Sequence, residues 1–527
     1  MTTTTAPPEH ESGTATPPET RVPLATKVAA GAGEAAINIG INLPKNFAFP
    51  IYNLALGVNP TLLGVALLLP RMWDAVIDPV MGTISDNTRS RWGRRRPYML
   101  VGALLSAACI LLLCLIPRGL NTSAWGSEPF SFIVTAPRGD WLYAGYLTLT
   151  SIIFYTALTL FSVPYGALTM ELTSDYRERT RVMSWRTFFT YLSGFLTAWL
   201  YAIAEWDIFK DAAGNKDVLK GTMAVGILLL VVMLAATLAP TLLVREPRVA
   251  APTKAQETEP KVGFWAQMRQ TFTEPAFLLI VASYTVGFLG VIMVIGLGLY
   301  IAIYHTYGGD RGTGSVVQAW SQTLAALVGI VTVFAINRVA GRLEKRTTLV
   351  ICLSISFVGG LSSWWLYDPS LPTWNLIGWL PGDARWPFHP LAFSTALIWP
   401  GLAGLLVMSN SMIADVCDLD ELRTGRRREA TYWAVFNWVQ KSAISLALLF
   451  SGTILDAIGF VSGADKQPDS VITNMRLAFA VVVCGGVGIA AVLAASIPLS
   501  RARLAQTHVA LAARRNLKAG KPDGTIT

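Results

Sequence analysis

Twelve apolar stretches of bilayer length constrain the fold of this 527-residue chain more than any other feature. A helix needs about 20 mostly apolar residues to cross the hydrocarbon core of a membrane. The predicted spans are 27–56, 61–85, 98–117, 141–167, 182–205, 219–244, 277–305, 316–340, 347–367, 392–416, 431–459 and 473–498. The polar segment Arg245–Thr273 divides them six and six, so we expect an all-α membrane protein with 12 transmembrane helices in two six-helix bundles.

The same pattern sets the expected domain boundaries. Residues 1–26 are rich in Thr, Pro and Glu and have no apolar core, so we predict a disordered cytoplasmic tail there. The remaining predicted units are an N-terminal bundle at 27–244, a cytoplasmic linker at 245–276, a C-terminal bundle at 277–498 and a cytoplasmic tail at 499–527.

The charges are few, and their distribution predicts the orientation. Only 14% of residues are charged, against about 25% in soluble domains. Sixteen Lys and Arg lie in the loops on the side of the two termini and nine lie in the opposite loops. Because cytoplasmic loops carry the basic excess, we predict an integral, multi-pass protein of the plasma membrane, the inner membrane in a bacterium, with both termini cytoplasmic. The net charge of +9 is then anchoring charge, and we expect no nucleic-acid partner and a monomer in the lipid bilayer.

Two carboxylates inside the second span are the strongest chemical signal. Asp74 and Asp78 are four residues apart and share one helix face. An ionised side chain at membrane depth costs several kcal/mol, on the order of 3 or more, so the pair predicts a cation site. Two close carboxylates either hold a metal ion such as Na⁺ or share a proton. The structural alternative is a local Arg71–Asp74 ion pair with Asp78 bonded to a neighbouring helix.

Polar side chains in the other spans predict a central cavity. In the first span Glu34, Asn38, Asn42 and Asn46 recur every four residues, with Lys45 beside the last. Such a stripe either lines a cavity or binds neighbouring helices. In the fourth span, Thr159 offers a hydroxyl that can complete a cation shell.

Three residues of the eleventh span share a face. They are Trp433, Asn437 and Lys441. Lys441 is deep in the span, which favours a cavity-facing position. Trp433 either stacks on a sugar ring or belongs to an interfacial belt. In the fifth span, Arg186 either reaches the cytoplasmic surface or turns inward as a donor to substrate or to a carboxylate. Acidic and basic residues at the cytoplasmic helix ends, around Glu178 and Asp415, suggest latches between the two halves.

Three separated blocks resemble the glycoside–pentoside–hexuronide:cation symporter family of the major facilitator superfamily. They are 71–82 with the basic turn after it, 163–168 with 175–180, and 414–421 continuing through 424–429 to Lys441. The resemblance covers nearly the whole chain. It implies a major-facilitator-type fold and a secondary symporter, not an enzyme, that imports a sugar or glycoside with H⁺ or Na⁺ by alternating access. It implies no cofactor besides the coupling ion. A carrier of a lysolipid or other amphiphile is the alternative, and a non-transporting sensor is a further one.

The resemblance also implies roles for individual residues. Asp74, Asp78 and Thr159 match the family's cation site, Arg186 matches a span-five arginine near the sugar, and Lys441 matches an inward-facing lysine. Asn38 and Ser162 fall on sugar-binding aspartates of the family, and we assign Asn38, Asn42, Ser162, Arg186, Trp433, Asn437 and Lys441 to the substrate site. Ile77 stands where a sodium-using member has an asparagine. The pair therefore lacks one oxygen ligand, and we expect protons rather than sodium to drive the protein.

Overall fold

The computed structural model describes most of the chain between Val22 and Leu511. The described residues are 22–88, 90–120, 127–132, 134–173, 176–210, 214, 216–244, 271–339, 342–375, 387–424, 428–501, 504–507 and 509–511. The predicted linker and both tails lie largely outside the described residues, and the domain boundaries stay a prediction.

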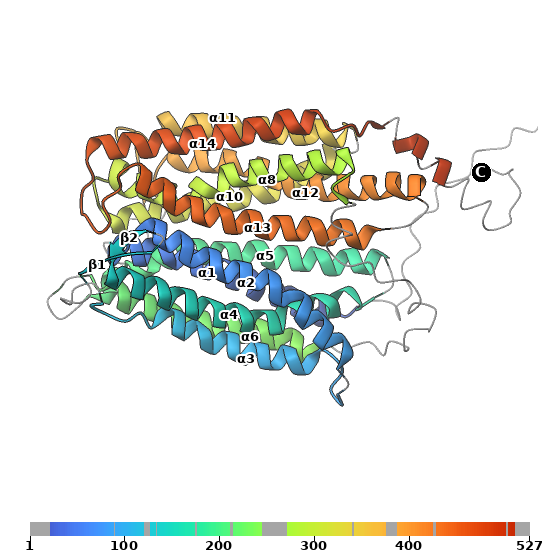
Figure 1. Cartoon of the computed structure of the whole chain (residues 1–527), viewed down its shortest axis with the longest axis horizontal. Coiled ribbons are helices and arrows are strands. Elements are labelled where there is room, and N and C mark those ends of the chain that lie inside the picture. The colour runs from blue at the N-terminus through green and yellow to red at the C-terminus, as the bar shows by residue number, and fades with distance from the viewer. Residues whose placement is uncertain are drawn as a thin grey trace, which may run out of the picture.

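Long helices dominate the described chain and lie roughly parallel (Figure 1). The first half holds α1 (Leu24–Phe47), the π-helix η2 (Ala48–Ala55), α2 (Pro60–Asn87), α3 (Arg96–Cys114), α4 (Arg138–Met170), α5 (Tyr176–Ala204), the short 3₁₀-helix η3 (Asp207–Phe209) and α6 (Val218–Leu243). The second half holds α8 (Pro275–Ile295), α9 (Leu297–Ile301), the π-helix η5 (Ala302–Thr306), α10 (Arg311–Val339), α11 (Lys345–Leu366), α12 (Leu391–Thr424), α13 (Glu429–Ala457) and α14 (Asp469–Ala495).

Four short strands form two hairpin-like pairs at one end of the helices. Strand β1 (Pro129–Ser131) pairs antiparallel with β2 (Thr135–Pro137), and β3 (Trp374–Asn375) pairs antiparallel with β4 (Pro387–Phe388). We call this end the hairpin end. The opposite end, where α1 begins and α14 ends, is called the termini end.

The predicted spans correspond to helices, with differences at their ends. Helix α12 runs to Thr424, eight residues beyond the predicted span 392–416, because a helix does not stop where its apolar surface stops. The first span is interrupted after Phe47 by η2, which contains Pro50. Proline cannot donate the backbone hydrogen bond of a regular helix, which agrees with the change of helix type there.

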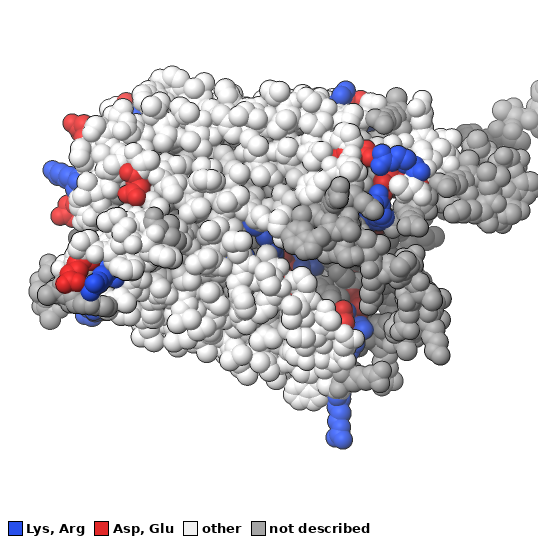
Figure 2. All heavy atoms as spheres, viewed as in Figure 1, with Lys and Arg blue, Asp and Glu red and all other residues white. Residues whose placement is uncertain are grey.

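The surface is that of a membrane protein. Eleven of the described helices are long and apolar enough to cross a bilayer. Helix α1 is not among them, because its polar stripe lowers its mean hydropathy. In Figure 2 the visible charged atoms gather at the two ends, and a wide band between them is almost uncharged. This arrangement buries apolar side chains in lipid and leaves the charges in water.

The two halves pack tightly against each other at the hairpin end. A Cβ at Gly64 of α2 would lie 2.7 Å from the Leu449 carbonyl oxygen of α13, and one at Gly452 would overlap the Pro60 carbonyl. The hydroxyl of Tyr300 also donates to Asn53 Oδ1 across the halves at 2.8 Å. Glycine is what allows the backbones to approach this closely.

Ion pairs at the termini end stay within one half wherever both partners are described. Lys27 pairs with Glu178 at 2.7 Å, and Lys345 pairs with Asp415 at 2.7 Å. In this conformation, none of the described ion pairs at this end joins the two halves, so none of them forms one of the predicted latches. A groove between the halves, with basic and acidic atoms inside it, is visible toward this end in Figure 2.

Candidate functional site

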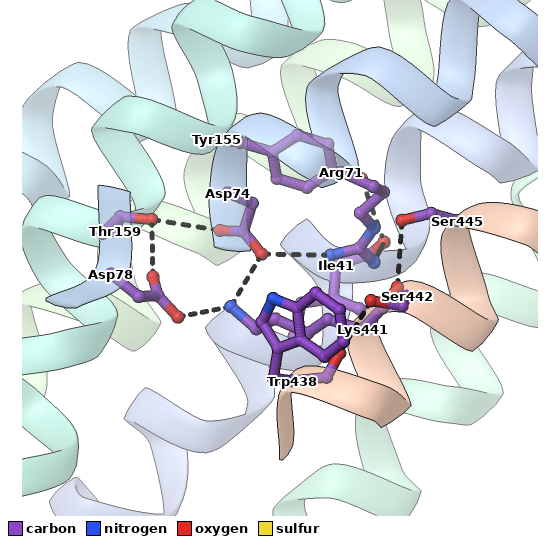
Figure 3. A network of polar contacts seen from close by, with 10 residues as sticks. All are labelled: Ile41, Arg71, Asp74, Asp78, Tyr155, Thr159, Trp438, Lys441, Ser442 and Ser445. Carbon is purple, nitrogen blue, oxygen red and sulfur yellow. Dashed lines mark hydrogen bonds and ion pairs between the residues drawn. The ribbon is translucent and has the colours of Figure 1, made fainter. Parts of the chain in front are cut away.

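The two carboxylates of α2 meet a lysine from the other half of the molecule (Figure 3). Lys441 Nζ lies 3.0 Å from Asp74 Oδ2 and also donates to Asp78 Oδ2. The hydroxyl of Thr159 on α4 lies 3.2 Å from Asp74 Oδ1 and 3.3 Å from Asp78 Oδ1. The predicted cation-site residues Asp74, Asp78 and Thr159 are thus brought together, with Lys441 between the carboxylates.

Arg71 supports one side of this cluster. Its guanidinium lies 3.7 Å from Asp74 Oδ2 and donates to the Ile41 carbonyl of α1 at 2.6 Å. The Tyr155 ring lies under the guanidinium, 4.7 Å from its carbon, and the Tyr155 hydroxyl reaches the same Ile41 carbonyl at 3.3 Å. The local Arg71–Asp74 contact of the structural alternative is therefore present, within a wider network that also contains Lys441.

The cluster is electrically balanced as it stands. Two carboxylates face two cations. Because the cluster is buried in a low-dielectric region, removing any one of these charges would leave another without its partner, which is costly. The Lys441 ammonium occupies the space between the carboxylates where a bound cation would lie. An incoming Na⁺ would have to compete with that ammonium, whereas a proton can bind a carboxylate oxygen directly and release one of its contacts.

Arg186 turns inward and forms a second polar cluster. Its guanidinium donates to Glu34 Oε2 at 2.9 and 2.5 Å and to the Thr169 hydroxyl at 3.0 Å. The Tyr165 ring lies 5.2 Å from the guanidinium carbon, and the Tyr165 hydroxyl donates to the Ala30 carbonyl. Of the two sequence alternatives for Arg186, the inward donor to a carboxylate is the one observed.

The remaining predicted substrate residues are spread along the interior. Asn38 Oδ1 accepts from the Ser193 hydroxyl at 3.1 Å, and Asn42 donates to the Asn38 carbonyl at 2.8 Å. Ser162 is half-buried and Asn437 is exposed. The Trp433 ring packs edge-on against Phe436, with 6.2 Å between ring centroids. Among the described contacts, none joins Arg186, Ser162, Trp433 or Asn437 to the Lys441 cluster.

Sequence reasoning missed several supporting residues. Tyr155 was not singled out, Tyr165 lay only within the block 163–168, and Glu34 was only part of a stripe. Each contacts a guanidinium. All three lie within a predicted span and carry a polar group at the end of a large or charged side chain. An arginine buried in a span needs such partners, so these residues could have been chosen as candidates.

The chain belongs to a known carrier family. It matches the family described as MFS/sugar transport protein over residues 29–501, where MFS stands for the major facilitator superfamily. The chain is therefore a multi-pass membrane carrier with the major-facilitator-type fold, and not an enzyme.

Individual relatives agree with this assignment. An uncharacterised symporter of Synechocystis sp. is 25% identical and aligns with 90% of this chain and 94% of its own length. A putative glycoside/cation symporter of Escherichia coli is 23% identical over 88% of this chain and 89% of its own. The crystal structure of a nucleoside transporter superposes with a TM-score of 0.56 at 10% identity, covering 90% of this chain and all of that one, which shows a shared fold.

Proposed function

We propose that this carrier is a proton-driven symporter that imports a sugar or glycoside. The observation that carries the proposal is the position of Lys441, which reaches from α13 to both carboxylates on α2. The family match and the symporter names of the relatives support coupled uptake of a sugar. A monomer embedded in the bilayer suffices for this scheme, since both halves come from one chain.

The two ends of the molecule differ in how tightly the halves pack, which supports alternating access. The basic loops support a cytoplasmic position for the termini end. With that orientation the tight glycine packing closes the outside, and the observed conformation faces inward. Outward opening requires α2 and α13 to separate at Gly64 and Gly452. The Lys441 contact is near the centre of this moving interface, so its charge state can bias the exchange between the two conformations.

Protons suit the cluster better than sodium. Sodium needs a shell of several oxygens, and Asp74, Asp78 and Thr159 supply only part of one. Ile77 adds no side-chain oxygen, and Lys441 already fills the space between the carboxylates. A proton on one carboxylate needs no such shell, and it removes one of the two negative charges that hold Lys441 in place.

Uptake into proteoliposomes tests this function. Purified protein is reconstituted and offered a panel of labelled sugars, glycosides and lysolipids, with an imposed pH gradient in choline buffer or an imposed Na⁺ gradient at constant pH. We expect a sugar or glycoside to accumulate with the pH gradient and without Na⁺. Uptake that requires Na⁺ and ignores the pH gradient would overturn proton coupling. Accumulation of lysolipids alone would overturn the substrate class.

A further inference from the structure

Glu205 is a buried carboxyl at the hairpin end, outside the Lys441 cluster. It follows the last residue of α5, and only 5% of it is exposed. The Tyr201 hydroxyl, one helical turn earlier, donates to Glu205 Oε1 at 2.7 Å. In the part of the chain that the structure describes, no cation forms an ion pair with Glu205. A buried carboxylate that is held by a neutral donor is costly, so its protonation state depends on how well it is shielded from water.

The charges that act on Glu205 come from both halves of the molecule. Lys216 lies in the loop before α6 in the N-terminal half, and Asp310 and Arg311 lie where α10 begins in the C-terminal half. Lys216 and Arg311 favour the ionised form of Glu205, as the Tyr201 hydrogen bond does, and Asp310 disfavours it. Each cation is shared with an exposed aspartate: Lys216 with Asp207 at 3.4 Å, and Arg311 with Asp465 at 3.6 Å.

This end of α5 lies against α10 of the other half. Trp199 Nε1 donates to the Thr323 hydroxyl at 3.1 Å, and the rings of Trp199 and Trp320 meet edge-on with 5.2 Å between their centroids. A Cβ at Gly312 would lie 2.8 Å from Lys216 Nζ, so the loop before α6 also reaches α10. The contact between the halves therefore helps to keep water from the buried carboxyl, and separation of the halves at this end would admit water to it.

Burial makes Glu205 easier to protonate while the hairpin end is closed. It raises the pKa of the Glu205 carboxyl above its usual value of 4.5, and the nearby cations offset only part of this rise. When the end opens and water reaches the carboxyl, its pKa returns toward the usual value. The conformation with the higher pKa binds the proton more tightly, so a lower pH favours the closed hairpin end.

We propose that Glu205 is a second proton-binding site of the carrier, which takes up a proton as the hairpin end closes and releases it as that end opens. This inference rests on the orientation and the alternating access of the proposed function. With the hairpin end outside, the proton comes from the outer medium and returns to it. Acid outside then favours the inward-facing conformation that is observed. The Asp74–Asp78 pair carries the coupling proton, whereas Glu205 adjusts the balance between the two conformations.

Spin labels on the two halves test the proposal. Cysteines replace Ile208 and Val461, which are exposed at the hairpin end and belong to different halves. The distances between the two labels, measured in nanodiscs from pH 8 to pH 5, give the ratio of closed to open molecules. This ratio should rise several-fold as the pH falls. Glu205→Gln resembles the protonated acid, so it should raise the ratio several-fold at pH 8 and change it little at pH 5.

Two further variants make the test specific. Glu128→Gln is the matched control, since it makes the same change at an exposed position of the hairpin end, and its ratio should follow that of the parent at every pH. Tyr201→Phe removes a hydrogen bond that favours the ionised form of Glu205, so the response should move to higher pH. Tyr201→Phe also tests the site if Glu205→Gln does not fold.

The outcomes separate this inference from the proposed function. A ratio at pH 8 that is the same in Glu205→Gln and the parent would overturn the second proton site and leave sugar symport standing. A response that Tyr201→Phe leaves at the same pH would also overturn it. The label distances need no substrate, so failure of every sugar in the uptake assay would overturn the proposed function and leave the proton site at Glu205 standing.

Discussion

Lys441 of α13 donates its ammonium hydrogen to the Asp78 carboxylate of α2, so a cation of one half neutralises an acid of the other half. Helices α2 and α13 are also the pair that packs through glycines at the hairpin end. The charge state of the carboxylates and the separation of the two halves are thus linked through the same two helices. A change at either place should alter transport in a defined way.

Neutralising Asp78 should uncouple the carrier. Asp78→Asn keeps the shape of the side chain and removes the charge that binds Lys441, so no proton can be carried at this position. We expect uphill accumulation to fall to the background of empty liposomes, while exchange of internal for external substrate at equal concentrations persists. Asp469→Asn, a similar change at an exposed position on α14, should accumulate substrate normally. Normal accumulation by Asp78→Asn would contradict the role of the pair.

A larger residue at Gly64 should prevent closure of the hairpin end. A Cβ there would already lie 2.7 Å from the Leu449 carbonyl oxygen, so Gly64→Leu overfills the contact. Overpacking costs about 1–3 kcal/mol, which favours the conformation in which this end is open. Uptake should fall at least several-fold. Ser462 accepts a hydrogen bond from Asn53 across this contact. A cysteine introduced at Ser462 should therefore react faster with an external thiol reagent.

Gly145 provides the matched control for this change. A Cβ at Gly145 of α4 would meet no atom within 4 Å, so Gly145→Leu adds the same bulk without crowding the interface. Its uptake and the reactivity of the Ser462 cysteine should match those of the parent protein. Equal effects of the two substitutions would show that bulk alone, and not closure, is responsible.

The sequence predicted the helices well because lipid imposes a simple rule. A backbone in hydrocarbon must satisfy its own hydrogen bonds, so bilayer-length apolar runs become helices. The position of Lys441 followed from the same reasoning, since a lysine deep in a span needs a polar neighbour. Its actual partners on α2 are more than 360 residues away, and no local pattern identifies them.

The contacts between helices could not be predicted from the sequence. The Glu34–Arg186 pair joins residues 152 apart, and it depends on how α1 packs against α5. Which end of the molecule is closed depends on a small free-energy difference between two arrangements of the same residues. For that reason the sequence did not indicate which end would be closed: the predicted latches at the termini end, which would form and break as access alternates, stay a prediction, and the close glycine packing at the other end was not foreseen.

The orientation in the membrane can be tested with single cysteines. Gly214 lies in a loop at the hairpin end, and Thr258 lies in the linker between the halves, outside the described residues. With both termini in the cytoplasm, a membrane-impermeant thiol reagent added to intact cells should label Gly214→Cys and should label Thr258→Cys only after the cells are opened. The parent chain, whose described cysteines are buried or half-buried, gives the background. The opposite labelling pattern would reverse the assigned orientation.

The contact between α1 and α5 at the termini end should make stability depend on pH. A hydrogen bond from Lys27, aided by Arg181 and the Val22 amide, lowers the pKa of Glu178 from 4.5 to about 2. Because the pKa is lower in the folded state, the carboxylate stabilises the fold fully above about pH 4.5, and this contribution is lost as the pH falls toward 2.

Glu178→Gln should therefore lower the Tm by a few degrees at pH 7, and the difference from the parent should shrink between pH 5 and pH 3. Thermal unfolding in nanodiscs measures this difference, with exposed Asp469→Asn as a control that should change little at any pH. A deficit for Glu178→Gln that is the same at pH 7 and pH 3 would mean that the side chain acts through its packing and not through its charge.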